Sequence, residues 1–286
     1  MAETATIELP QGAVGYRIAG PDDATASPVV FVHGFLVDGS VWSGVADLLA
    51  DQGIRSYAPD WPLGAHRHAL AADADRSPRG VASHILAFLE ALDLNDVTLV
   101  GNDTGGALIQ FVLDTDPGRV GRIVLTNCDA FDTFPPFPFN VVFGLLRGEH
   151  RMRFSLTPMR VRALRHSPLG FGLLANDLDP VQSAAWIEPS LTDPDIRRDA
   201  VRFLEAVRPK DLLDVASRLD TFEGPVRLVW GMADRSFKPA LGRRLQQSFS
   251  QAEFVEVPDA RTFVQLDSPA ALAEQIVEVD SAAPPA

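Results

Sequence analysis

The sequence TLVGNDTGG, Thr98 to Gly106, places an aspartate where an apolar run gives way to a helix-like pattern. Gly101, Asp103 and Gly105 have the small-x-nucleophile-x-small spacing of a nucleophile elbow, with aspartate in place of serine. A sharp strand-to-helix turn favours glycine there, because flanking side chains would collide with the adjacent strand and helix. A carboxylate at such a turn could attack an electrophilic carbon directly, since it is already ionised at neutral pH. The alternative interpretation is a tight connection without chemistry.

Two other segments end where an elbow of this kind needs partners. VVFVHGF, Val29 to Phe35, follows a buried-strand pattern with His33 and Gly34, so the backbone N–H of Phe35 could pair with that of Thr104 as an oxyanion hole. LVWGMADRSF ends a late strand pattern with Asp234, where the acidic member of a catalytic triad would lie. A solvated turn residue is the alternative for Asp234.

The chain resembles α/β-hydrolase-fold proteins, and among them the aspartate-nucleophile branch that contains haloalkane dehalogenases and epoxide hydrolases. The resemblance rests on the His-Gly segment, on APDWPLG at 58–64, on the Gly-x-Asp-x-Gly elbow and on the Trp-Gly-x-x-Asp segment. It implies that Asp103 forms a covalent ester with the substrate, that Phe35 and Thr104 supply backbone donors, and that Asp234 is the supporting acid. It implies no metal and no organic cofactor.

The sequence departs from that branch at the histidine that activates water. The matching stretch, VPDARTFVQLD, has Thr262 at the histidine position, and threonine cannot act as a base near neutral pH. His66, in DWPLGAHRHAL, is the first candidate for a replacement base, with a structural hydrogen bond as its alternative. His33 is expected to orient the oxyanion loop instead. A carboxylate pair of Asp103 and Asp234, one of them protonated, is a further alternative.

The leaving group also lacks its usual partners. Haloalkane dehalogenases of this branch usually have tryptophan directly after the nucleophile, where this chain has Thr104. Epoxide hydrolases of this branch protonate the epoxide oxygen with tyrosines of the cap, whereas the only tyrosines here, Tyr16 and Tyr57, precede the elbow. Asn127, at the end of the strand pattern RIVLTN, and Trp186 could donate hydrogen bonds to a leaving group. Packing in the core is the alternative for Trp186.

Short apolar runs alternate with helical patterns, which predicts an α/β fold with a mostly parallel central sheet flanked by helices. The predicted strands are 14–18, 29–32, 56–58, 97–100, 123–125, 226–229 and 254–257. Residues 133–219 show helical periodicity without a convincing strand, and are rich in phenylalanine, proline and arginine. We therefore predict a core of residues 1–132 and 220–286 with an inserted helical cap of 133–219, whose aromatic side chains could line an apolar pocket.

Composition narrows the class of partner. The 286 residues include 25 basic and 38 acidic side chains, a net charge of −13, so nucleic acid and anionic membranes are not expected partners. A single cysteine cannot form an internal disulfide, and the N-terminus lacks the pattern of a secretory signal, which together predict a cytoplasmic protein. A monomer and a homodimer are both compatible with these features.

The predicted function is a hydrolase that uses Asp103 as nucleophile on a hydrophobic small molecule, such as an epoxide or a haloalkane, through an alkyl-enzyme ester. Because Thr262 replaces the histidine, a non-hydrolytic ligand-binding protein and a lyase or isomerase on the same scaffold are the alternatives.

Overall fold

The structure, a computed structural model, describes residues 3–281 and is built on one eight-stranded sheet. The strand order is β1-β2-β4-β3-β5-β6-β7-β8, in which β1 and β2 are antiparallel and the strands from β4 to β8 are parallel. The strands are β1 (Glu3–Ile7), β2 (Val14–Ala19), β3 (Val29–Val32), β4 (Ser56–Pro59), β5 (Val97–Asp103), β6 (Val120–Cys128), β7 (Val226–Gly231) and β8 (Ala252–Val257). This architecture confirms the predicted fold class.

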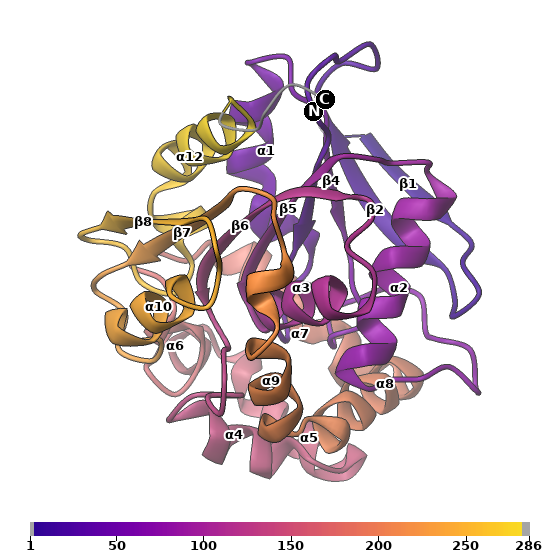
Figure 1. Cartoon of the computed structure of the whole chain (residues 1–286). Helices are drawn as coiled ribbons and strands as arrows, with labels where there is room; N and C mark the ends of the chain where they lie inside the picture. The colour runs from indigo at the N-terminus through magenta and orange to yellow at the C-terminus, as the bar shows by residue number, and fades with distance from the viewer. Residues whose placement is uncertain (1–2, 282–286) are drawn as a thin grey trace.

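Helices cover both faces of the sheet (Figure 1). The helices α1 (Ser43–Ala50) and α12 (Pro269–Ser281) pack together, and α2 (Pro78–Ala91) packs against α3 (Thr104–Thr115). Two short helices, α10 (Pro239–Gln246) and α11 (Val264–Asp267), follow β7 and β8. The start of α2 is fixed by sequence chemistry, because Ser77 Oγ accepts a hydrogen bond from Gly80 N at 3.1 Å and proline occupies the first helical position.

The segment between β6 and β7 contains six α-helices and lies at the end of the molecule away from the chain termini (Figure 1). They are α4 (Phe139–Leu146), α5 (Glu149–Leu156), α6 (Arg162–Arg165), α7 (Pro180–Thr192), α8 (Pro194–Ala206) and α9 (Pro209–Ala216). All six lie within residues 133–219, the segment that the sequence predicts as a cap. It adjoins the carboxyl ends of the parallel strands, where open α/β sheets bind ligands.

The seven strands predicted from apolar runs are all present, and only β1 was not predicted. Its sequence, ETATI, is short and has only two apolar residues, Ala5 and Ile7. This fits its place at the sheet edge, where most of its side chains are exposed. The described helices include none long and apolar enough to span a bilayer.

Candidate active site

Asp103 ends β5 and is followed directly by α3. Its backbone has φ 54° and ψ −128°, a conformation that residues other than glycine rarely adopt. Glycine on either side makes the turn possible. A Cβ at Gly101 would lie 2.7 Å from Ile109 Cδ1, and a Cβ at Gly105 would overlap the carbonyl oxygen of Val32. The turn therefore presents the Asp103 side chain at the carboxyl edge of the sheet, as the elbow pattern predicts.

A backbone donor from the loop after β3 holds the Asp103 carboxyl group. Phe35 N donates to Asp103 Oδ2 at 3.2 Å, and the backbone N–H of Thr104, the first residue of α3, also lowers the pKa of this carboxyl group. The loop comes this close because residue 34 is glycine: a Cβ there would overlap Asp103 Oδ2. Both predicted backbone donors thus act on one carboxyl group, and the one from Phe35 forms a hydrogen bond to it.

Burial dominates the ionisation of Asp103. Loss of solvent raises the pKa of Asp103 from 3.8 to about 7, the backbone N–H groups of Thr104 and Phe35 oppose that rise, and the charge of Asp234 adds to it. The carboxyl group therefore changes charge near neutral pH. An acid at this pKa can serve as a nucleophile or as a general base under physiological conditions.

Asp234 and Thr262 meet beside the elbow. Thr262 Oγ1 donates to Asp234 Oδ2 at 2.8 Å, so threonine takes the contact that a histidine would make with the acid. The loop is tied to the elbow, since Asn102 Nδ2 donates to the Thr262 carbonyl at 2.7 Å. Burial raises the pKa of Asp234, while hydrogen bonds, the first from Ser236 N at 2.7 Å, hold it down.

The side chains of Asn127 and Trp186 are engaged elsewhere. Asn127 Nδ2 donates to Asp234 Oδ2 at 2.9 Å and to the Gly231 carbonyl at 3.0 Å, so this amide positions the acid. Trp186 Nε1 donates to Ser40 Oγ at 3.2 Å. The ring of Trp186 is fully buried, with edge contacts to two phenylalanines. In this arrangement neither side chain offers its N–H to a leaving group at Asp103.

Both nitrogens of His33 are occupied. Trp61 N donates to His33 Nε2 at 2.8 Å, so the neutral ring carries its proton on Nδ1, which donates to the Gly34 carbonyl at 2.9 Å. Burial lowers the pKa of His33 and keeps the ring neutral. The structure thus places His33 behind the oxyanion loop, hydrogen-bonded to it.

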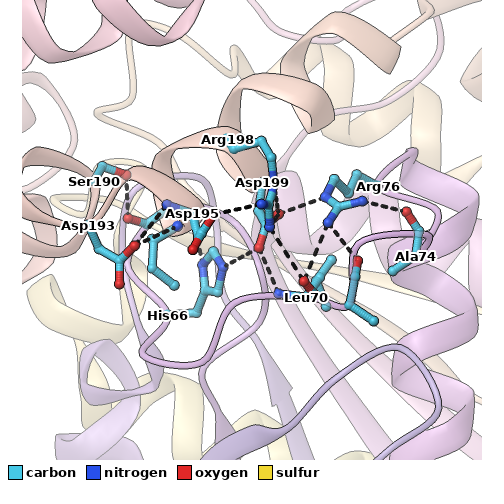
Figure 2. Close-up of polar contacts among 12 residues, drawn as sticks. His66, Leu70, Ala74, Arg76, Ser190, Asp193, Asp195, Arg198 and Asp199 are labelled. Atoms are coloured by element: carbon cyan, nitrogen blue, oxygen red, sulfur yellow. Dashed lines mark hydrogen bonds and ion pairs between the residues drawn. The ribbon is translucent and has the colours of Figure 1, made fainter.

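His66 belongs to a buried polar cluster that joins the loop after β4 to α8 (Figure 2). His66 Nδ1 accepts from Gly64 N at 3.2 Å, and Nε2 lies 3.5 Å from Asp199 Oδ2. Asp199 also pairs with Arg76 at 2.6 Å and accepts from Leu70 N at 2.7 Å. His66 is not among the side chains that line the cavity at Asp103. The structure therefore brings Asp103, Phe35, Thr104 and Asp234 together and gives His66 different partners.

Asp129 is a buried acid of this site that the sequence analysis missed. Thr104 Oγ1 donates to Asp129 Oδ2 at 3.3 Å, and Asp129 N donates to the Asp103 carbonyl at 3.3 Å. Its other oxygen, Oδ1, is buried without a hydrogen-bond partner among the described residues. Burial first, and the charge of Asp103 second, raise the pKa of Asp129 far above its usual range. A signal was available, because Asp129 directly follows β6, next to the strand that carries Asp103.

Asp103 faces a cavity of about 300 Å³ between the core and the helices that follow β6. Asp103 is the only charged residue among those that line it, and Ser155 is the only uncharged polar side chain. The walls are apolar, with Phe35, Phe143, Leu146, Leu156, Met159 and Phe171 as main contributors. Within residues 3–281 there is no group of three or more histidine, cysteine or acidic side chains arranged to bind a metal. The cavity therefore suits a small, uncharged, hydrophobic molecule.

Comparisons with known proteins give a consistent result. The alpha/beta hydrolase fold family matches residues 27–269. Haloalkane dehalogenase 2 of Mycobacterium tuberculosis is 26% identical over 282 residues, 92% of this chain and 91% of that protein. A 2-hydroxy-6-oxononadienedioate/2-hydroxy-6-oxononatrienedioate hydrolase of Paraburkholderia xenovorans is 27% identical over 234 residues, 80% of this chain and 78% of that protein.

Solved structures agree on the fold. The crystal structure of a haloalkane dehalogenase from Agrobacterium tumefaciens superposes with a TM-score of 0.77 at 19% identity, covering 97% of both chains. This likeness concerns the fold alone, whereas the family match and the sequence relatives confirm the predicted enzyme class, a hydrolase of the α/β-hydrolase fold.

Proposed function

Because the chain belongs to the α/β-hydrolase fold family, we propose that it is a hydrolase whose Asp103 carboxylate attacks an electrophilic carbon of a hydrophobic small molecule, such as an epoxide or a haloalkane. One observation carries the proposal. The carboxyl group of Asp103 faces an apolar cavity, with one oxygen held by the backbone N–H of Phe35 at 3.2 Å. A carboxylate fixed in this way needs no reorganisation before it attacks.

In the first step, an Asp103 oxygen forms a bond to the substrate carbon, and the bond from that carbon to the leaving group breaks. The electron pair of the broken bond leaves with the halide or stays on the epoxide oxygen, and Asp103 becomes a neutral ester. No general base is required, because the attacking carboxylate is already ionised above its pKa of about 7. The apolar walls exclude water and favour the approach of an uncharged substrate.

In the second step, water adds to the ester carbonyl, and the C–O bond to the product breaks after a tetrahedral oxyanion has formed. In this proposal the N–H groups of Phe35 and Thr104 stabilise that oxyanion, which the hydrogen bond from Phe35 N to Asp103 Oδ2 supports. The water must lose a proton, and Thr262 cannot accept it, although it makes the contact to Asp234. We therefore expect formation of the ester to outpace its hydrolysis.

The test is intact-protein mass spectrometry after incubation with a panel of hydrophobic epoxides and haloalkanes, followed by peptide mapping. We expect an adduct on the peptide that contains Asp103. The Asp103→Asn variant should show neither adduct nor turnover. The control Asp51→Asn, which replaces an exposed acid at the end of α1, should behave as wild type. Full activity of Asp103→Asn on any substrate that the wild type converts would refute the proposal.

A second candidate function is favoured by the same pKa. An acid that titrates at about 7 is well matched to general-base catalysis, and the absence of histidine at 262 leaves hydrolysis without its usual catalyst. In a lyase or isomerase, Asp103 would remove a substrate proton without forming an ester. Such an enzyme would exchange substrate hydrogen with deuterated water and would incorporate no ¹⁸O from labelled water. A ligand-binding protein would do neither.

A further inference from the structure

Exposed apolar side chains are concentrated in the segment that follows β6, both in its helices and in the turns between them. The structure describes seven large apolar side chains that are more than half exposed, and six of them lie between residues 137 and 169. They are Phe137, Val141, Leu145, Phe154, Val161 and Leu169, with exposed fractions from 55% to 86%. We call these six residues, with the exposed arginines described below, the cap face. Concentrated apolar exposure of this kind usually marks a surface that contacts something other than water.

The cap face continues into the mouth of the Asp103 cavity. Leu145, 59% exposed, and Leu169, 86% exposed, both also line that cavity. Val141 and Leu145 lie one turn apart in α4, so their side chains share one side of the helix. Figure 1 shows α4 and α5 together at the end of the molecule opposite the termini. A molecule that enters the cavity therefore passes between exposed apolar side chains.

The cap face is also basic, in a chain with 38 acidic and 25 basic residues. Residues 133–176 include six arginines, while their only acidic residue is Glu149. Five of these arginines are exposed: Arg147, Arg151, Arg153, Arg160 and Arg162. Among the side chains that the structure describes, only Arg160 of these five forms an ion pair, with Glu188 at 3.5 Å. Four exposed cations therefore share the segment of the exposed apolar side chains and have no acidic partner in the described chain.

We propose that the cap face docks on an anionic lipid surface. Exposed arginines are attracted to lipid phosphate groups, and exposed apolar side chains insert at the boundary between headgroups and acyl chains. The net charge of −13 argued against such a partner, but charges on the far side of the molecule are screened beyond about 8 Å at physiological ionic strength. The charges that meet the lipid are then those of the cap face.

Docking in this orientation would turn the mouth of the cavity, at Leu145 and Leu169, toward the lipid. A hydrophobic ligand dissolved in the bilayer could then enter without crossing bulk water. The proposal goes beyond the hydrolase function, because lipid binding does not depend on the reaction at Asp103. It can therefore be tested on the wild-type protein without a substrate.

The experiment is co-sedimentation of the full chain with unilamellar vesicles of phosphatidylcholine alone or with about one third phosphatidylglycerol. We expect binding to the anionic vesicles at least about tenfold tighter than to neutral ones. Binding should be lost at about 1 M salt, where screening acts over about 3 Å. Absence of binding to anionic vesicles at low salt would overturn the proposal, as would binding that is insensitive to salt.

Variants locate the surface. Arg151→Glu with Arg153→Glu should weaken binding more than about tenfold, because each basic side chain near the surface contributes about fivefold. Phe154→Ser with Leu169→Ser should weaken it as well, and all four positions are exposed, so the fold should be retained. A charge-reversed variant that folds and binds as wild type would refute the assignment.

Matched controls come from exposed residues outside the cap face. Arg202→Glu in α8, where the side chain is 66% exposed, and Val181→Ser in α7, where it is 77% exposed, should bind as wild type. Equal losses in these controls would refute the assignment to the cap face. Sedimentation velocity tests whether a second copy of the chain covers the cap face instead. A wild-type dimer that is abolished by Phe154→Ser with Leu169→Ser, in a protein that does not bind vesicles, would refute the lipid proposal in favour of dimerisation.

Discussion

Replacing Asp103 with asparagine is expected to stabilise the folded protein at neutral and alkaline pH, although it should abolish the proposed reaction. Asparagine has the same shape, and it tolerates the positive φ of 54° at this position. The backbone donors Phe35 and Thr104 can still face a carbonyl oxygen of the amide. The substitution therefore removes mainly the cost of ionising a buried carboxyl group.

The size of the effect follows from the pKa. The carboxyl group of Asp103 titrates at about 7 in the folded state, against 3.8 ordinarily, so between these pH values the folded state binds a proton that the unfolded state has lost. Wild-type stability should fall over this range by about 1.4 kcal/mol per pH unit, reaching about 4 kcal/mol above pH 7. Below the pKa of Asp103 in the unfolded chain, both the folded and the unfolded state are protonated, and the loss of stability disappears. The asparagine variant lacks this loss at every pH.

Urea unfolding of wild type and Asp103→Asn at several pH values between about 5 and 8 measures the effect. We expect the free energy of unfolding of the variant, relative to wild type, to rise with pH and to level off above about 7. The exposed Asp51→Asn variant should show no such trend. A difference between Asp103→Asn and wild type that is constant over this range would refute the argument that burial raises the pKa of Asp103.

Three further predictions concern the same site and the cluster behind it. The rate of ester formation, followed by rapid-quench mass spectrometry, should rise about tenfold per pH unit below pH 7 and then level off; a pH-independent rate contradicts an attacking carboxylate at this pKa. Thr262→His should speed ester breakdown about a hundredfold or more by giving Asp234 a base to orient, and unchanged breakdown in a folded variant contradicts this. Burial alone would raise the pKa of Asp199, but hydrogen bonds from His66, Arg76 and Leu70 N lower it to about 2. The ionised Asp199 should therefore stabilise the fold above about pH 4, and this stabilisation should be lost as the pH falls toward 2. Asp199→Asn should therefore cost about 3 kcal/mol at neutral pH in urea unfolding, far more than Asp195→Asn, whose side chain is 63% exposed.

The elbow could be predicted because its constraints are local and steric. Gly101 and Gly105 lie within two residues of Asp103, and the space that a side chain would need is filled by neighbouring backbone and side chains. The apolar runs of β3 and β5 are equally local, since both faces of these two strands are buried. Phe35 could be placed opposite Asp103 because Phe35 follows β3 and Asp103 ends β5, the adjacent parallel strand.

The partners of polar side chains could not be predicted in the same way. His66 contacts Asp199, which lies 133 residues further along the chain, so the sequence near His66 gives no indication of this contact. The types of Asn127 and Trp186 allow a hydrogen bond to a leaving group, but the direction of their N–H groups depends on Asp234 and Ser40, which folding brings close. Side-chain type indicates what a residue can do, whereas its direction depends on contacts distant in sequence.

Formation of an ester at Asp103 would change the pKa of the neighbouring buried acid, Asp129. Among the described residues, none of Asp103, Asp129 and Asp234 is paired with lysine or arginine, and the charge of Asp103 helps to raise the pKa of Asp129. When Asp103 becomes an ester, it loses that charge, so the pKa of Asp129 must fall. Burial is the larger cause of the raised pKa of Asp129 and does not change when the ester forms, so the pKa of Asp129 stays raised in both states. Asp129 is not among the residues that line the cavity, and its side chain is hydrogen-bonded to Thr104, so we still expect slow hydrolysis of the ester in a site with threonine at 262.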